Sequence, residues 1–160
     1  MLNICQKCGK YHADKLIDPS GSYAICPACG YKHLFRRLPL LVCTGPSGSG
    51  KTAVCSFLLQ KTQEFVIMES DILWRKEFDS PESNLNDYRN MWLRVCKNIS
   101  QSGRPVLLCG STNPGQFEKC VESRYFSSIH YIALVCDDDV LESRLKSRPS
   151  WRVSGSKGNI

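Results

Sequence analysis

From residue 38 onward, short continuous apolar runs alternate with stretches in which apolar residues recur at helical spacing. The runs predict four buried strands, at residues 38–44, 65–68, 106–109 and 129–135. Helical spacing follows three of them, at residues 53–58, 88–99 and 140–145. This alternation predicts a three-layer α/β/α fold around a mostly parallel sheet. Ligands of such sheets bind beyond the carboxyl ends of the strands, so the chemistry is expected there.

Residues 1–37 lack this pattern and contain two C-x-x-C pairs instead. The four cysteines are Cys5, Cys8, Cys26 and Cys29. Zinc binds four thiolates in a tetrahedron, and this spacing lets both sulfurs of a pair face one ion. Gly9 and Gly30 follow the pairs, where the backbone must turn sharply. We therefore predict a zinc ribbon at residues 1–37, which the metal stabilises because so short a segment buries little apolar surface.

The role of this ribbon stays open at the level of sequence. It could be a structural element or a surface that contacts nucleic acid or substrate. Its aromatic residues suit either role: Tyr11, Tyr23, Tyr31 and His33. His12 and His33 are not expected as zinc ligands, because four thiolates already complete the tetrahedron.

Residues 45–52 read GPSGSGKT and match the phosphate-loop pattern G-x-x-x-x-G-K-[ST] in full. The predicted nucleotide-binding residues are Gly45, Pro46, Ser47, Gly48, Ser49, Gly50, Lys51 and Thr52. Glycines let backbone amides approach the phosphates closely, and the N-terminus of the next helix adds partial positive charge. We expect Lys51 to reach the β- and γ-phosphates and Thr52 to bind Mg²⁺ through its hydroxyl.

Acidic residues follow the second and fourth predicted strands. Glu69 and Asp71 come just after the second, where one could orient the magnesium shell and the other could accept a proton from an acceptor hydroxyl. The alternative is that Ser70 or Asp71 caps a helix. The third strand ends without an acid, at Cys109. Asp137 follows the fourth strand and is expected to begin a helix, with a role beside an attacking water as the alternative.

The end of the chain is basic, with five Lys/Arg and no acids from residue 143 to residue 160. Arg144, Arg148 and Arg152 lie in this segment. Cationic side chains there could close over a triphosphate and neutralise charge in the transition state. The alternative is a solvated basic tail.

Composition fits a globular protein, with 42% hydrophobic and 22% charged residues among 160. The formal net charge is +6. A zinc ion with four thiolates would reduce it to about +4, which suits a bound nucleotide and does not require nucleic acid. The N-terminus lacks the apolar core of a signal peptide, and the apolar runs are too short to span a bilayer, so we expect a cytoplasmic protein without a membrane partner.

Six further cysteines lie mostly on the predicted strands and helices. They are Cys43, Cys55, Cys96, Cys109, Cys120 and Cys136. Buried cysteine behaves as a small apolar residue, so these are expected to be packing residues.

Three motifs together resemble the P-loop small-molecule kinases, which include adenylate, shikimate and gluconate kinases and chloramphenicol phosphotransferase. They are GPSGSGKT, the E-S-D after the second strand, and R-L-K-S-R before the basic segment. The resemblance covers residues 38–152. With the ribbon included, the chain is similar to bacterial nucleoside-kinase-like ATP-binding proteins.

The resemblance implies roles for individual residues. Lys51 and Thr52 would hold phosphate and magnesium, Glu69 would lie near the metal, and Asp71 would contact the acceptor or act as the base. Arg144 would pack on adenine, Arg148 would reach the transferring phosphates, and Arg152 would belong to a lid. The chain departs from the family in having Glu at position 69, where the kinases have Asp. We also expect the kinase-like domain, residues 38–160, to lack the family's final strand and helix.

These observations favour an ATP-dependent phosphotransferase that uses ATP, Mg²⁺ and a zinc ribbon. The expected acceptor is a nucleoside or nucleotide, bound by residues 72–90, which include Trp74, Arg75 and Arg89. Two alternatives stay open. One is an ATP-binding switch or ATPase with Asp137 as the acid beside water. The other is a polynucleotide 5′-kinase that docks nucleic acid on the ribbon. Oligomeric state is not predicted.

Overall fold

The larger sheet has four parallel strands in the order β5 (Val66–Glu69), β6 (Val106–Cys109), β4 (Leu40–Thr44) and β7 (Ile129–Ala133). The structure is a computed structural model that describes residues 2–79 and 85–148. All four strands match the predicted positions to within two residues at each end, and β6 matches at both ends. Glu69, Cys109, Cys43 and Ile132 lie side by side across the sheet. The carboxyl ends therefore share one edge, as predicted.

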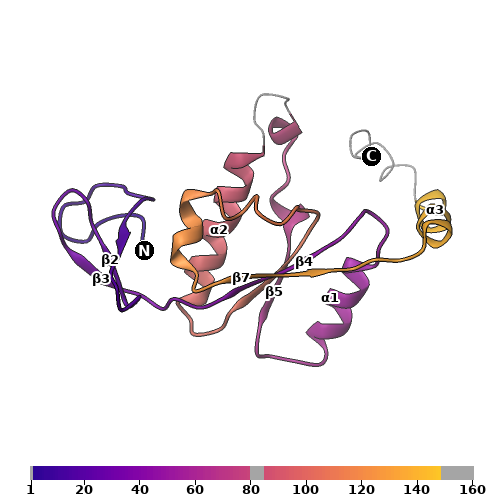
Figure 1. Ribbon diagram of the computed structural model, residues 1–160, viewed down its shortest axis with the longest axis horizontal. Helices are drawn as coiled ribbons and strands as arrows, with labels where there is room; N and C mark the ends of the chain where they lie inside the picture. Colours follow the sequence, from indigo (N-terminus) through magenta and orange to yellow (C-terminus); the bar gives the residue numbers. More distant parts are fainter. Residues whose placement is uncertain (1, 80–84, 149–160) are drawn as a thin grey trace.

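Helices cover both faces of this sheet (Figure 1). Leu40 and Val42 of β4 pack with Trp92 of α2 (Asn86–Ser100) on one face. On the other face, Cys43 packs with Cys55 of α1 (Lys51–Leu59). A third helix, α3 (Asp138–Lys146), follows β7, and three short 3-10 turns complete the set: η1 (Ser70–Leu73), η2 (Lys76–Asp79) and η3 (Val121–Tyr125). The three-layer α/β/α prediction is confirmed.

The buried face of α1 differs from the prediction. Cys55 is 2% exposed and packs against the sheet with Leu58, whereas Phe57 is 60% exposed. Phe57 lies about 200° around the helix from Cys55, because each residue advances the helix by roughly 100°. The apolar spacing predicts one face for Ala53, Val54, Phe57 and Leu58. Leu58 does pack against the sheet, but Phe57 does not, and Cys55 is the buried side chain of the helix.

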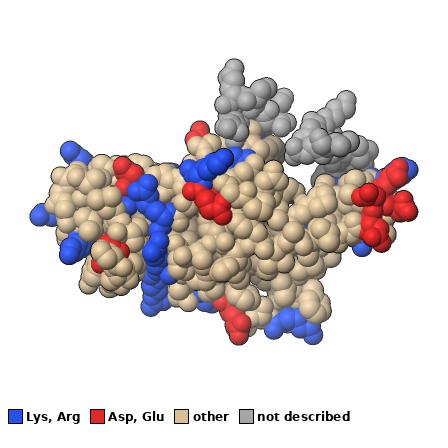
Figure 2. Space-filling model, viewed as in Figure 1, with Lys and Arg blue, Asp and Glu red and all other residues tan. Residues whose placement is uncertain are grey.

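The ribbon contains a separate three-stranded antiparallel sheet at the opposite end of the long axis from α3 (Figure 1). Its strands are β1 (Leu16–Ile17), β2 (Tyr23–Ile25) and β3 (Lys32–Leu34). Phe35 and Tyr125 lie edge to face, with ring centroids 5.9 Å apart. The Tyr125 hydroxyl donates to the Ala13 carbonyl at 2.9 Å. The ribbon is therefore packed firmly on η3 and α2, and a band of Lys and Arg marks the junction (Figure 2).

A buried ion network connects the ribbon to α2. The Glu122 side chain is fully buried and accepts hydrogen bonds from Asn3 Nδ2 and Arg94 Nε, each at 2.9 Å. Its second oxygen contacts the Lys97 ammonium group, which is also buried. Burial lowers the pKa of Lys97 to about 8, and Glu122 opposes that shift. The ribbon thus supplies one of three donors to a carboxylate in the body of the protein.

Replacing Glu122 by alanine is expected to lower the free energy of unfolding by about 3–5 kcal/mol, because the Lys97 ammonium group would be left buried and unpaired. Urea denaturation followed by circular dichroism measures this change. The matched control is Glu142→Ala, which removes an exposed i,i+4 pair with Lys146 and should cost no more than about 0.5 kcal/mol. Equal losses in the two variants would contradict a special role for the buried network.

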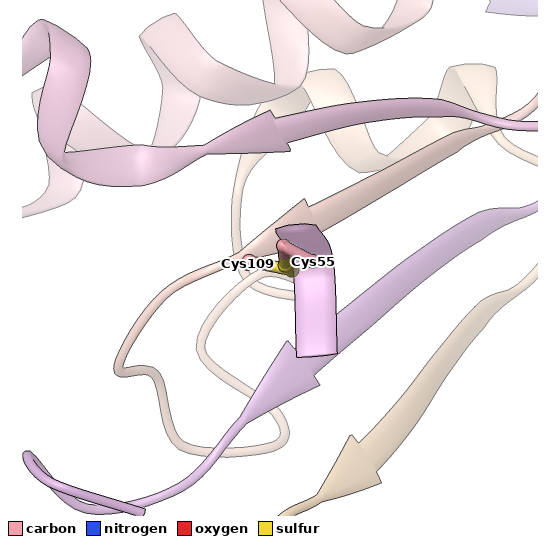
Figure 3. Close-up of a disulfide and its surroundings, with 2 residues drawn as sticks. All are labelled: Cys55 and Cys109. Atoms are coloured by element: carbon pink, nitrogen blue, oxygen red, sulfur yellow. A yellow bond between two sulfur atoms is a disulfide. The ribbon is translucent and has the colours of Figure 1, made fainter. Parts of the chain in front are cut away.

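Two of the six cysteines predicted as packing residues have another role. Cys55 of α1 and Cys109 at the end of β6 form a disulfide (Figure 3). Both are buried in the core, as predicted, but the disulfide was not anticipated, because their 54-residue separation hides a contact that the βαβ topology creates. Cys43, Cys96 and Cys120 are free and buried, as expected of packing cysteines. The disulfide ties the helix that follows the phosphate loop to the central region of the sheet.

None of the helices in the described part of the chain combines the length and the apolar character needed to cross a membrane.

Candidate active site

The phosphate loop connects β4 to α1 at the carboxyl edge of the sheet, as its sequence predicts. Gly48 and Gly50 have φ values of 91° and 103°, which glycine adopts without strain. A Cβ atom on Gly45 would collide with the Leu134 carbonyl oxygen and would lie 2.9 Å from Ser49 Oγ. The loop is therefore held tightly against the chain that leaves β7.

The interior of the loop fits a phosphate group. Ser49 Oγ is buried and has no hydrogen-bond partner among the described residues. The amides at the N-terminus of α1 point into the same region, because the first turn of a helix has no internal acceptors for them. Lys51 Nζ donates to the carbonyls of Gly45 and Pro46, at 2.8 and 2.9 Å. Its ammonium group thus lies over the loop, where phosphates could replace these carbonyls as acceptors.

Asp71 lies within electrostatic range of Lys51. Burial lowers the pKa of Lys51, and the carboxylate of Asp71 opposes this shift. Arg148 contributes in the same direction as burial. The carboxyl edge of the sheet therefore places Asp71, which follows β5, near two cations. They are Lys51 of the phosphate loop and Arg148 of the basic segment.

The backbone at Ser70 fixes the position of this acid. Tyr88 Oη and Trp92 Nε1, both on α2, donate to the Ser70 carbonyl at 2.5 and 3.0 Å. On the other side, a Cβ atom on Gly110 would lie 2.7 Å from Ser70 Cβ and would collide with the Ser70 hydroxyl, so only glycine fits there. The sequence pattern assigned Tyr88 and Trp92 to the core, and their polar atoms carried no signal of this positioning role.

The alternative that Ser70 or Asp71 caps a helix finds no support. Both residues lie inside η1, whose N-cap is Glu69, and no side-chain cap hydrogen bond forms. Glu69 is the last residue of β5 and is half-buried beside Cys109. The carboxylates of Glu69 and Asp71 therefore lie at the end of β5 and in the turn after it, and neither forms a capping hydrogen bond.

The loop after β6 also contacts the phosphate loop, which the sequence reasoning did not anticipate. Thr44 Oγ1 donates to the Thr112 carbonyl at 2.6 Å, and the Thr112 amide donates back to Thr44 Oγ1 at 3.1 Å. Ser111 Oγ donates to the Gly45 carbonyl at 3.3 Å. In the sequence, the only signal of this contact was that the loop follows the end of a predicted strand. The loop brings hydroxyl and amide groups, and no acid, to this edge.

Two of the three predicted arginines contact the phosphate loop. Arg144 Nη1 donates to the Gly48 carbonyl at 3.2 Å, and Arg148 Nη1 donates to Ser47 Oγ at 2.8 Å. Arg152 falls outside the described residues. Asp137 is the N-cap of α3, which matches the expectation that it begins a helix. The basic segment is therefore next to the predicted triphosphate site as far as the structure describes it.

An aromatic cluster lies next to the acids, in the region predicted to bind the acceptor. The ring centroids of Trp74, Phe78 and Tyr88 are 5.1–6.1 Å apart. Trp74 forms the outer part of the cluster and is 45% exposed. Arg75 is exposed, and Arg89 takes part in an interaction within the protein. The three rings are tilted or edge to face, and Trp74 is the exposed member of the cluster, three residues along the chain from Asp71.

The four cysteines of the two C-x-x-C pairs lie together in the ribbon, with sulfur atoms within 4.8 Å of one another. Cys5 and Cys29 Sγ are 3.6 Å apart, and Cys8 and Cys26 Sγ are 3.9 Å apart. In a tetrahedron with zinc–sulfur bonds of about 2.3 Å, the sulfurs would be separated by about 3.8 Å. The four sulfur atoms are therefore close enough together to bind one zinc ion.

The surroundings of Cys5 favour its thiolate, whereas those of Cys29 favour its thiol: a hydrogen bond from the backbone at Tyr31 lowers the pKa of Cys29, but burial and the contacts with the other three sulfurs outweigh it and raise that pKa to about 11. Burial would raise the pKa of Cys5, but hydrogen bonds from the backbone at Cys8 and Lys7 and from His33 outweigh it and lower that pKa to about 5. Lys15 is fully buried, with Nζ 3.2 Å from His33 Nε2. Its positive charge lies near all four sulfurs and offsets part of their negative charge. His33 thus supports the ligands, and the cluster itself contains only cysteines.

Comparison with known proteins defines the fold further. No protein-family model matches the chain, and no curated protein matches it. Among solved structures, a sugar kinase from Janibacter sp. HTCC2649 aligns over 75% of each chain, with 17% identity and a TM-score of 0.53. The protein APE1195 aligns over 71% of this chain and 69% of its own, with 17% identity and a TM-score of 0.51. A gluconokinase from Sinorhizobium meliloti 1021 aligns over 71% and 67%, with 24% identity and a TM-score of 0.48. The first two likenesses show that the chain shares its α/β fold with that sugar kinase and with APE1195.

Proposed function

We propose that this chain is an ATP-dependent phosphotransferase that moves the γ-phosphate to a small-molecule acceptor, and that the acceptor is a nucleoside or nucleotide. The observation that carries the proposal is the position of Asp71 directly after β5, at the carboxyl edge of the sheet where the phosphate loop with Lys51 follows β4. An ATPase needs only a water molecule as the acceptor of the γ-phosphate. An acid beside an open aromatic surface suits transfer to a second molecule instead. Residues 1–37 would form the zinc ribbon and residues 38–160 the kinase-like domain.

In this proposal the donor half of the site is the phosphate loop. Lys51 exchanges the carbonyls of Gly45 and Pro46 for β- and γ-phosphate oxygens and so stabilises the charge that develops during transfer. Arg148 would reach the transferring phosphates, and Arg144 would pack on adenine. Both already contact the loop through Ser47 and Gly48.

Oxygen donors suited to Mg²⁺ are present at the same edge. The Thr52 hydroxyl is exposed in the first turn of α1, and the Glu69 carboxylate ends β5. These are the hard ligands that magnesium prefers, with water completing its shell. When bound, the ion neutralises charge on the β- and γ-phosphates.

The acceptor half would be formed by Asp71 and the aromatic cluster. The Asp71 carboxylate accepts the proton of the attacking hydroxyl, and its position is set by the two hydrogen bonds from α2 to the Ser70 carbonyl. Trp74 offers its exposed face to a planar ring. A nucleobase stacked there would be held a few residues from the acid, which favours a nucleoside or nucleotide over a non-aromatic acceptor.

Replacing Asp71 by asparagine is expected to lower the rate of phosphate transfer by roughly 100- to 10,000-fold, because the general base is lost while the shape of the side chain is kept. Transfer from γ-labelled ATP to a panel of nucleosides, nucleotides, sugars and sugar acids measures this. Asp138→Asn, an exposed change in α3, is the matched control.

A wild-type chain that transfers no phosphate above background to any member of the panel would contradict the proposal. ATP hydrolysis without an acceptor that is lost in Asp137→Asn and kept in Asp71→Asn would identify an ATPase instead.

Replacing Trp74 by alanine should raise the KM for the acceptor about 5- to 100-fold with little change in the KM for ATP, because stacking of a base on an aromatic ring is lost. Steady-state kinetics with each substrate varied in turn measures the two constants. Trp74→Phe keeps a ring and should recover most of the affinity. An unchanged acceptor KM in Trp74→Ala would show that the acceptor binds elsewhere.

A further inference from the structure

A cleft lies between the ribbon and the body of the protein, apart from the phosphate loop. Its volume is about 510 Å³, within the range of small-molecule sites, roughly 300–1,000 Å³. We call it the junction cleft. The ribbon lines it with Leu16 and Ile17, the connection to β4 with Arg37, and the body with residues 118–121, 123 and 124. The ribbon and α3, which flanks the phosphate loop, are at opposite ends of the molecule (Figure 1), so this cleft is separate from the proposed active site.

Positive charge dominates the junction cleft. Arg37, Lys119 and Arg124 line it together with one acid, Glu118. No salt bridge between these cations and a carboxylate is found among the described residues. Arg37 and Lys119 are exposed and donate no side-chain hydrogen bond within that part of the chain. Both therefore keep their donors available for an anion.

The third cation is fixed in place. Arg124 Nε donates to the Val121 carbonyl at 2.9 Å, and Nη1 donates to the Asp14 carbonyl of the ribbon at 3.0 Å. Its guanidinium group is thereby held across the junction with its charge uncompensated. A fixed guanidinium beside two free cations is an arrangement that favours a phosphate group, which accepts several charge-assisted hydrogen bonds at once.

The other side of the junction cleft is apolar. Leu16 is 59% exposed, and Ile17 and Val121 lie beside it. An exposed leucine next to unpaired cations suits a ligand that has both an apolar part and an anionic part. Inorganic ions would use only the cations and would leave this surface uncovered.

We propose that the junction cleft binds a phosphate ester of about the size of a mononucleotide, with its phosphates on Arg37, Lys119 and Arg124 and its apolar part against Leu16 and Val121. Such a ligand would contact both the ribbon and the body and would stabilise their junction. This site is independent of the proposed phosphotransfer reaction.

The size of the junction cleft argues against a nucleic-acid strand as the ligand. Its volume of about 510 Å³ suits a ligand of nucleotide size. The ribbon aromatics do not decide the question, since His33 is buried whereas Tyr11 and Tyr31 are 53% and 37% exposed. A nucleic-acid strand is therefore kept as an outcome of the test.

Calorimetric titration with the non-hydrolysable analogue β,γ-imido-ATP tests the proposal by counting sites. We expect two equivalents in the wild-type chain with Mg²⁺. Lys51→Ala should keep the site in the junction cleft, which needs no Mg²⁺. The double variant Arg37→Gln/Lys119→Gln should keep only the phosphate-loop site. The affinity of the analogue for the junction cleft of this variant should fall at least 100-fold, at roughly tenfold for each charge removed.

The control removes the same amount of charge elsewhere, through Lys32→Gln/Lys61→Gln, and should leave both sites intact. A single equivalent in the wild type that disappears in Lys51→Ala would overturn the proposal. So would equal weakening in the control variant, since that would indicate unspecific attraction.

A twelve-nucleotide deoxythymidine strand serves as a second probe. It should bind more weakly than the nucleotide analogue. Tighter, steeply salt-dependent binding that is lost in Arg37→Gln/Lys119→Gln would overturn the assignment of a small ligand and identify a nucleic-acid surface. The site in the junction cleft is also counted in Lys51→Ala, which lacks the lysine of the phosphate loop. Its presence can therefore be judged whether or not the chain transfers phosphate.

Discussion

Replacing Lys51 by alanine is expected to lower phosphate transfer by at least about 100- to 1,000-fold, which is the cost of removing one charged donor from a transition state. Lys51 Nζ lies over the phosphate loop, on the carbonyls of Gly45 and Pro46, and is the ammonium group nearest to the predicted phosphates. In the variant no other side chain of the loop can supply this charge, because Lys51 is the one charged residue in GPSGSGKT. Transfer from γ-labelled ATP and calorimetric titration with the ATP analogue give the rate and the affinity.

The matched control for this variant is Lys61→Ala, which removes an exposed lysine just beyond α1 whose main contact is with the Phe57 ring. Both variants should keep the wild-type circular dichroism spectrum, because neither lysine takes part in the core. Transfer at the wild-type rate by Lys51→Ala would mean that the phosphate loop does not hold the transferring phosphate, and the proposed function would fail with it.

Removal of zinc is expected to unfold the ribbon while the larger sheet stays folded. Structural zinc sites contribute about 10–16 kcal/mol of apparent binding free energy at neutral pH, far more than the small core of this ribbon can supply. The sulfurs of Cys5, Cys8, Cys26 and Cys29 lie close to tetrahedral spacing. Without the metal, their thiolates would repel one another around the buried Lys15.

A variant and a chelator test this prediction together. Cys26→Ser should lose the equimolar zinc found by elemental analysis, and hydrogen exchange should become fast in residues 2–35 and stay slow in β4, β6 and α2. Cys136→Ser, which changes a free cysteine outside the cluster, is the control. A protein that stays protected in the ribbon after chelation, or Cys26→Ser with a full equivalent of zinc, would show that the metal is not what folds this segment.

Loss of the ribbon should also weaken the body of the protein. Asn3 supplies one of three donors to Glu122, and the Tyr125 hydroxyl bonds to the Ala13 carbonyl. The midpoint of urea unfolding of the remaining sheet should therefore fall in zinc-free protein. This effect identifies the ribbon as part of one folded unit with α2 and η3.

The amino-acid sequence by itself determined the features that depend on local period and spacing. Four apolar runs placed the strands, and β6 was predicted at both of its ends. The full phosphate-loop motif located the connection between β4 and α1, and two C-x-x-C pairs located a cluster of four sulfurs. Each of these signals lies within a few neighbouring residues, where backbone geometry alone limits what the chain can form.

Only the tertiary structure decided which distant residues meet. The disulfide of Cys55 with Cys109, the burial of Glu122 among donors from two other segments, and the two hydrogen bonds from α2 to the Ser70 carbonyl all join positions far apart in the chain. Apolar periodicity marks a face of a helix as buried, but it does not identify the side chains on the other side of the contact. The partner of a polar atom depends on how the whole sheet is ordered, and that order is a property of the folded chain.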